Sequence, residues 1–153
     1  MFPLKKILCP TDFSEPSLLA MSAAVELAES SGAELFFIHA VSPLPASPHP
    51  GAMHGFDTAA FLRKMLTYGR ESIERLIREK VPDKVPAQSV VLAGNPSDEI
   101  IRAAEEHGVD LIVIATHGLT GWRRFVFGSV AERVVRLSSC PVLTIPAPEQ
   151  GEE

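Results

Sequence analysis

Residues 110–116 read DLIVIAT, an almost unbroken apolar run that is typical of a strand covered on both faces. A loop containing glycines follows, and residues 128–137 have the pattern of a helix. Working outward, the same reasoning predicts strands over residues 4–9, 33–41, 87–93 and 141–145, and helices over residues 14–32, 56–80 and 97–108. Strand and helix therefore alternate along the chain and close with a fifth strand. This order predicts one α/β domain with a parallel sheet, right-handed crossovers and helices on both faces.

The composition limits the classes of function. A chain of 153 residues with 46% hydrophobic and 22% charged residues suits one soluble domain, and its net charge of −5 argues against nucleic acid as a partner. No apolar run approaches the roughly 20 residues of a membrane span, and the start does not have the pattern of a signal peptide. Cys9 and Cys140 are too few for a disulfide framework, so we expect a cytoplasmic protein without a membrane partner.

Two loops follow the carboxyl ends of strands, where open parallel sheets bind their ligands. The first covers residues 10–14 and the second residues 116–129. In the second loop, Gly118 allows close approach of the backbone to a phosphate, and Gly128 opens a helix whose free N–H groups favour an anion. The usual glycine fingerprints of NTPases and dinucleotide-binding proteins are absent. From the residues alone, a phosphate site and an ordinary tight loop remain equally good interpretations.

Motifs along the whole chain resemble the universal stress protein family. They are the segments 10–14 (PTDFS), 94–96 (GNP), 116–118 (THG), 128–132 (GSVAE) and 140–143 (CPVL). The resemblance implies a Rossmann-like open sheet of five parallel strands in the order 3-2-1-4-5. It also implies a nucleotide-binding domain over residues 1–148, a flexible acidic tail over 149–153, and a homodimer formed through the strand at 141–145.

The family divides into ATP-binding and non-binding groups, and the pattern of the binding group is Gly-x-x-Gly, nine residues, then Gly-Ser/Thr. Here Gly118, Gly128 and Ser129 match this pattern, whereas Ala115 replaces the first glycine. The resemblance implies that Asp12 hydrogen-bonds the adenosine and that the backbone of Val41 meets the adenine edge. The full implied set for ATP, AMP or ADP is Pro10, Thr11, Asp12, Val41, Ala115, Thr116, His117, Gly118, Arg123, Gly128, Ser129, Val130 and Ala131, with Mg²⁺ shared by the phosphate oxygens.

The resulting functional expectation is a cytosolic, nucleotide-dependent regulatory dimer in the stress response, acting on an unknown protein. One alternative is a slow ATPase or nucleotidyl-transfer enzyme at the same site, for which His117 and Asp12 are the only candidate bases. Another alternative is a dimeric interaction module that binds no nucleotide. The retained glycine pattern favours nucleotide binding over this last interpretation.

Several residues also have plain structural interpretations. Asp12 could form an Asx turn, and His117 could simply support its loop. Arg123 and Arg124 could screen phosphates or form a solvated face, and Trp122 is more typical of a packing contact. His49, His54 and Asp57 do not have the spacing of a standard metal site and fit a mobile loop better. Cys9 and Cys140 lie at opposite ends of parallel strands, which predicts two unpaired, buried thiols.

Overall fold

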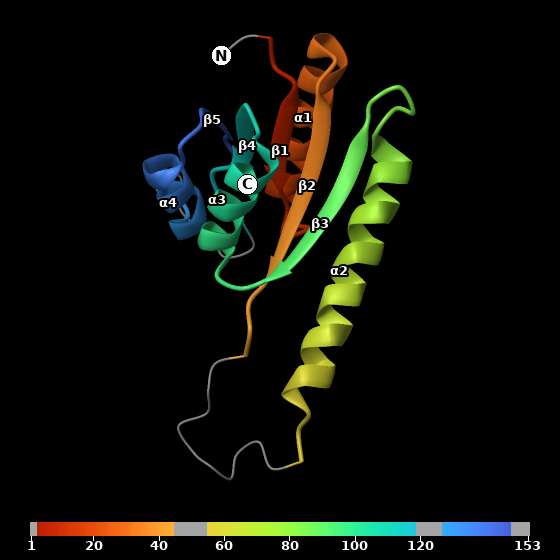
Figure 1. Ribbon diagram of the computed structural model, residues 1–153, viewed down its shortest axis with the longest axis vertical. Coiled ribbons are helices and arrows are strands. Elements are labelled where there is room, and N and C mark those ends of the chain that lie inside the picture. The colour runs from red at the N-terminus through yellow and green to blue at the C-terminus, as the bar shows by residue number, and fades with distance from the viewer. Residues whose placement is uncertain (1–2, 45–54, 119–126, 148–153) are drawn as a thin grey trace, which may run out of the picture.

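The computed structural model describes residues 3–44, 55–118 and 127–147 (Figure 1). In chain order, the elements of this part are β1 (Lys6–Pro10), α1 (Glu15–Ser31), β2 (Glu34–Val41), α2 (Thr58–Lys80), β3 (Ala87–Ala93), α3 (Pro96–His107), β4 (Leu111–Ala115), α4 (Ser129–Leu137) and β5 (Val142–Ile145). None of the helices in these ranges is long and apolar enough to cross a membrane. The predicted tail at 149–153, together with His49, His54, Trp122, Arg123 and Arg124, lies outside the described residues.

The strands form one parallel sheet in the order β3-β2-β1-β4-β5, which confirms the predicted topology. The central strand β1 has β2 on one side and β4 on the other. Leu8 stands opposite Phe36 of β2 and opposite Ile112 of β4. The loops that leave the carboxyl ends of β1 and β4 are therefore brought to neighbouring positions, although about a hundred residues separate them in the chain.

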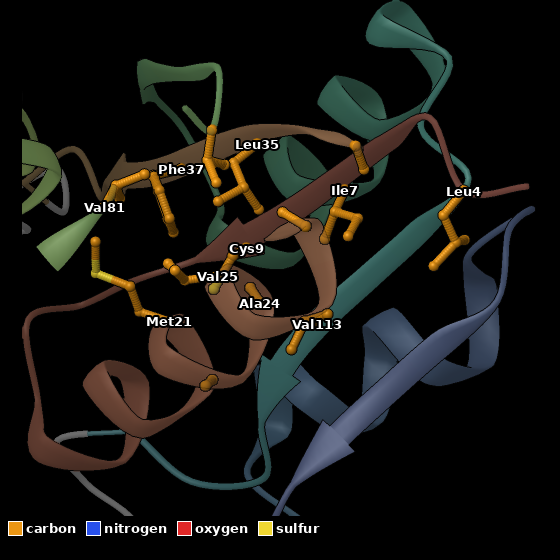
Figure 2. Packing of buried hydrophobic residues seen from close by; sticks show 14 of the residues in the cluster. Leu4, Ile7, Cys9, Met21, Ala24, Val25, Leu35, Phe37, Val81 and Val113 are labelled. Carbon is orange, nitrogen blue, oxygen red and sulfur yellow. The ribbon is translucent and has the colours of Figure 1, made fainter. Parts of the chain in front are cut away.

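Each face of the sheet carries its own hydrophobic core, because side chains alternate along a strand. On the face covered by α1 and α2, Ile7 and Cys9 pack with Phe37 and Met21 (Figure 2). On the opposite face, Leu8 packs with residues of α3 and α4. Burial on both faces explains why β1 is apolar from Ile7 to Pro10. Full burial of one large aliphatic or aromatic side chain contributes about 1.5–3 kcal/mol.

The helix boundaries follow local capping chemistry. As predicted, Ser14 caps α1 and Gly32 ends it, with φ of 73°. The predicted start of α3 is wrong, because Asn95 rather than Ser97 or Asp98 is the N-cap, and its Oδ1 accepts hydrogen bonds from the N–H groups of both. Pro96 then occupies the first turn, where a missing N–H costs nothing.

The second helix also differs from its prediction at its first turn. It begins at Thr58 rather than at position 56, because the Asp57 carboxylate accepts a 2.9 Å hydrogen bond from the Ala60 N–H and caps the helix. Asp57 is therefore accounted for by a helix cap.

Both cysteines are free thiols, as predicted, but only one of them is buried. Cys9 is fully buried on β1, and this burial raises the pKa of its thiol to about 12. Cys140 is only partly buried, which corrects the prediction of two buried thiols. The reason is its position just before β5, the edge strand, which has a neighbour on one side only.

Candidate functional site

The loop between β1 and α1 holds Asp12 in a defined conformation. The Asp12 Oδ1 atom accepts a 3.0 Å hydrogen bond from the Ser14 N–H and a second bond from the Ser14 hydroxyl. This is an Asx turn, so the structural interpretation of Asp12 is confirmed for one of its carboxylate oxygens. Thr11 supports the same turn, because its Oγ1 accepts a 3.0 Å bond from the Phe13 N–H.

The loop after β4 begins with Thr116 and His117. The Thr116 N–H donates to the Ile145 carbonyl at 2.9 Å, which continues the pairing of β4 with β5. The Thr116 Oγ1 lies 2.9 Å from His117 Nδ1, whereas His117 Nε2 is buried and has no hydrogen-bond partner in the described part of the chain. His117 therefore supports its loop through one ring nitrogen.

The two loops meet at Gly118. A Cβ atom at this position would collide with Asp12 Oδ2 and would lie 3.5 Å from Asp12 Cγ. Only glycine leaves room for the carboxylate here, and the residue needs no positive φ, so the requirement is one of space rather than of backbone conformation. The expected proximity of Asp12 and Gly118 is thus present in the structure.

The N-terminus of α4 closes the other side of this loop. The Gly128 N–H donates to the Thr116 carbonyl at 2.7 Å, and a Cβ at position 128 would lie only 3.2 Å from that oxygen. Gly128 is the N-cap of α4 and, because glycine has no side chain, it offers the helix no side-chain cap. The N–H groups of the first turn, at Ser129, Val130 and Ala131, are the ones that a helix leaves without intrahelical acceptors, and they favour an anion.

The remaining predicted residues lie at or near the same edge of the sheet, with one exception. Pro10 and Ala115 are the last residues of β1 and β4, and both are buried. Val41 is the last residue of β2, and its carbonyl accepts a 3.0 Å hydrogen bond from the Gly94 N–H. Arg123 falls outside the described residues.

One residue at this edge had no predicted role. His39 of β2 places Nδ1 2.9 Å from the Thr11 carbonyl oxygen, and its ring lies 4.6 Å from the ring of Phe13, centroid to centroid. Phe13 itself has a φ of 66°, which is uncommon for a residue other than glycine. The available sequence signal was a single polar residue inside the apolar run of β2.

This edge of the sheet brings together several groups that can hydrogen-bond a ligand. It combines the Asp12 carboxylate, the backbone N–H groups at the start of α4, and the hydroxyl groups of Thr116 and Ser129. Among the described residues, no group of three or more His, Cys, Asp or Glu side chains could hold a metal ion.

Comparisons with known proteins show the family and fold that this chain resembles. The model of the universal stress protein family matches residues 3–146. The universal stress protein MJ0531 of Methanocaldococcus jannaschii is 36% identical over 148 residues, which cover 95% of this chain and 84% of the relative. The solved structure of MJ0577 from the same organism has a TM-score of 0.81 at 27% identity, covering 96% of this chain and 99% of its own. A universal stress protein solved in complex with cAMP has a TM-score of 0.64 at 25% identity, covering 94% and 97%.

Proposed function

The chain belongs to the universal stress protein family, and we propose that it binds an adenine nucleotide (ATP, ADP or AMP) at the carboxyl edge of β1 and β4. The observation that carries this proposal is the close approach of Gly118 to the Asp12 carboxylate. A carboxylate and a backbone that can approach a phosphate closely are thereby placed at one position. The similar fold of a universal stress protein in complex with cAMP supports the same class of ligand.

In this proposal, each part of the nucleotide meets a different element. Asp12 accepts a hydrogen bond from the ribose, and the backbone at Val41 meets the adenine edge. Gly118 and the first turn of α4, from Gly128 to Ala131, hold the phosphates, which fits a helix whose N-cap residue is a glycine without a capping side chain. Mg²⁺ would neutralise phosphate charge when it is bound, while the protein's own contribution is binding and orientation.

We further propose a homodimer that pairs through residues 141–145 and acts in the cytoplasm as a nucleotide-dependent regulator of a protein still to be identified. The support is the position of β5, the edge strand on this side of the sheet. Its Leu143 is 38% exposed, and Val135 and Leu137 of the neighbouring α4 are also exposed. An edge strand with apolar side chains is a natural surface for pairing with a second copy.

The test of nucleotide binding has two parts. The purified protein is denatured and the released small molecules are separated by chromatography, and the refolded or nucleotide-free protein is titrated with ATP and AMP, with and without Mg²⁺, in a calorimeter. We expect a released adenine nucleotide or a saturable binding curve. A protein that releases none and shows no titratable binding would refute the proposal and leave the interaction-module interpretation.

A further inference from the structure

We infer that His39 is a positioning residue that holds Asp12 in place for the nucleotide, an inference that rests on the proposed function. His39 does not belong to the predicted site. It lies on the α1–α2 face of the sheet, two positions after Phe37, where the apolar core ends and the polar edge begins.

The first contact of His39 is with the backbone of the Asp12 loop. Its Nδ1 lies 2.9 Å from the carbonyl oxygen of Thr11, which belongs to the peptide group that links Thr11 to Asp12. A carbonyl oxygen only accepts hydrogen bonds, so Nδ1 is the protonated ring nitrogen and donates the hydrogen bond to Thr11. This bond fixes the orientation of the peptide plane directly before Asp12.

The second contact is with Phe13, directly after Asp12. The two rings are tilted by 45° with centroids 4.6 Å apart, which is within the range of favourable aromatic pairs. Phe13 holds a left-handed backbone conformation, with φ of 66°, which costs energy for a residue with a Cβ. His39 thus contacts the chain on both sides of Asp12, and its contact with Phe13 helps to keep an unfavourable conformation populated.

The third contact fixes His39 from behind. A Cβ at Gly69 of α2 would lie 2.8 Å from His39 Cδ2, closer than real contacts of this kind. Gly69 has no positive φ, so glycine is needed here for space and not for backbone conformation. The His39 ring therefore lies between α2 and the Asp12 loop, and a side chain added at Gly69 should push it toward that loop.

Variants at His39 test this role with a matched pair. Asparagine can place an amide N–H near the position of Nδ1, whereas leucine removes the donor and keeps a bulky apolar side chain. We expect His39→Leu to raise the Kd for AMP and ATP, measured by calorimetry, about two- to ten-fold, which is the effect of one hydrogen bond. His39→Asn should restore most of the affinity. In an Asp12→Ala background, His39→Leu should weaken binding no further, because its effect passes through Asp12. A wild-type Kd in His39→Leu, or a loss that adds in full to that of Asp12→Ala, would overturn the inference.

Gly69→Ala provides an independent variant that changes no polar group. We expect it to weaken nucleotide binding although Gly69 is not a proposed ligand contact, and unchanged binding in the folded variant would count against the inference. If wild-type protein binds no nucleotide, the proposed function fails, and the positioning role is then read from amide NMR shifts. The shifts of Phe13, Ser14 and Gly118 should change in His39→Leu and return toward wild type in His39→Asn. Unchanged shifts in His39→Leu would overturn the positioning role by itself.

Discussion

Replacing Gly118 by alanine tests the candidate site with a single methyl group. The new Cβ would collide with Asp12 Oδ2, and the carboxylate can only move by turning away from the bonds that it accepts from Ser14. It would then leave the position from which it is proposed to bind the ribose. Loss of one hydrogen bond to a charged group costs about 1.5–3 kcal/mol, so we expect the Kd for ATP to rise about ten- to hundred-fold.

A second glycine variant separates loss of binding from loss of stability. Gly108 ends α3 with φ of 59°, and a Cβ there would meet no atom within 4 Å. Gly108→Ala therefore adds backbone strain of about 1–2 kcal/mol far from the proposed ligand contacts. For a domain of this size we expect its Tm to fall by about 2–8 °C while the Kd stays at the wild-type value.

The two variants should differ in calorimetric titration. Gly118→Ala should lose affinity and also some stability, because the Asp12 carboxylate gives up bonds from Ser14, whereas Gly108→Ala should lose stability alone. Wild-type affinity in Gly118→Ala, measured beside a wild-type protein that binds ATP, would show that Asp12 and Gly118 do not face the same ligand. A wild-type Kd in both variants together with a lower Tm in both would assign Gly118 a purely structural role.

Three further predictions concern other parts of the chain. Iodoacetamide should modify Cys140 but not Cys9 in the folded protein, because burial raises the pKa of the Cys9 thiol to about 12. Peptide mass spectrometry identifies the labelled cysteine, and labelling of Cys9 in the folded protein would contradict the prediction. Asp110→Asn should lower the free energy of unfolding at pH 7, since two backbone N–H groups bond to that carboxylate and lower its pKa. This stabilisation is present above the unfolded pKa of about 3.9 and is lost as the pH falls through the lower folded value, so urea titrations should show a smaller difference from wild type at pH 3, and an equal difference at both pH values would contradict the assignment. Leu143→Arg should convert a dimer into a monomer in analytical ultracentrifugation, and a monomeric wild type would exclude pairing through β5.

The fold could be predicted because its strands and helices produce recognisable patterns of apolar residues in the sequence. Nearly continuous apolar runs at residues 33–41 and 110–116 indicate strands that are covered on both faces, and the alternation with helices allows few other topologies. The cap of α3 was missed because Asn95, Ser97 and Asp98 are all good capping residues, and only the backbone geometry shows which oxygen reaches the free N–H groups.

Only the parts of the site that lie at strand ends or in recognisable motifs could be predicted from the sequence. Asp12 and Gly118 follow the ends of β1 and β4, so a parallel sheet with these two strands side by side brings them together. His39 was missed because its role depends on Gly69, a residue of a helix that comes later in the chain and whose approach is visible only in three dimensions. A polar residue in an apolar strand marks such a position but does not name its partner.

The central place of β1 has a consequence for synthesis of the protein on the ribosome. β2 pairs with one edge of β1 soon after both have been made, but β4, which covers the other edge, is made about 70 residues after the end of β2. At about 5–20 residues per second, that edge has no partner for roughly 4–14 s. During this interval β1, which directly precedes the Asp12 loop, presents unpaired backbone groups and apolar side chains, which is the kind of surface that chaperones protect. Rapid synthesis of this protein would therefore depend on the chaperone capacity of the cell.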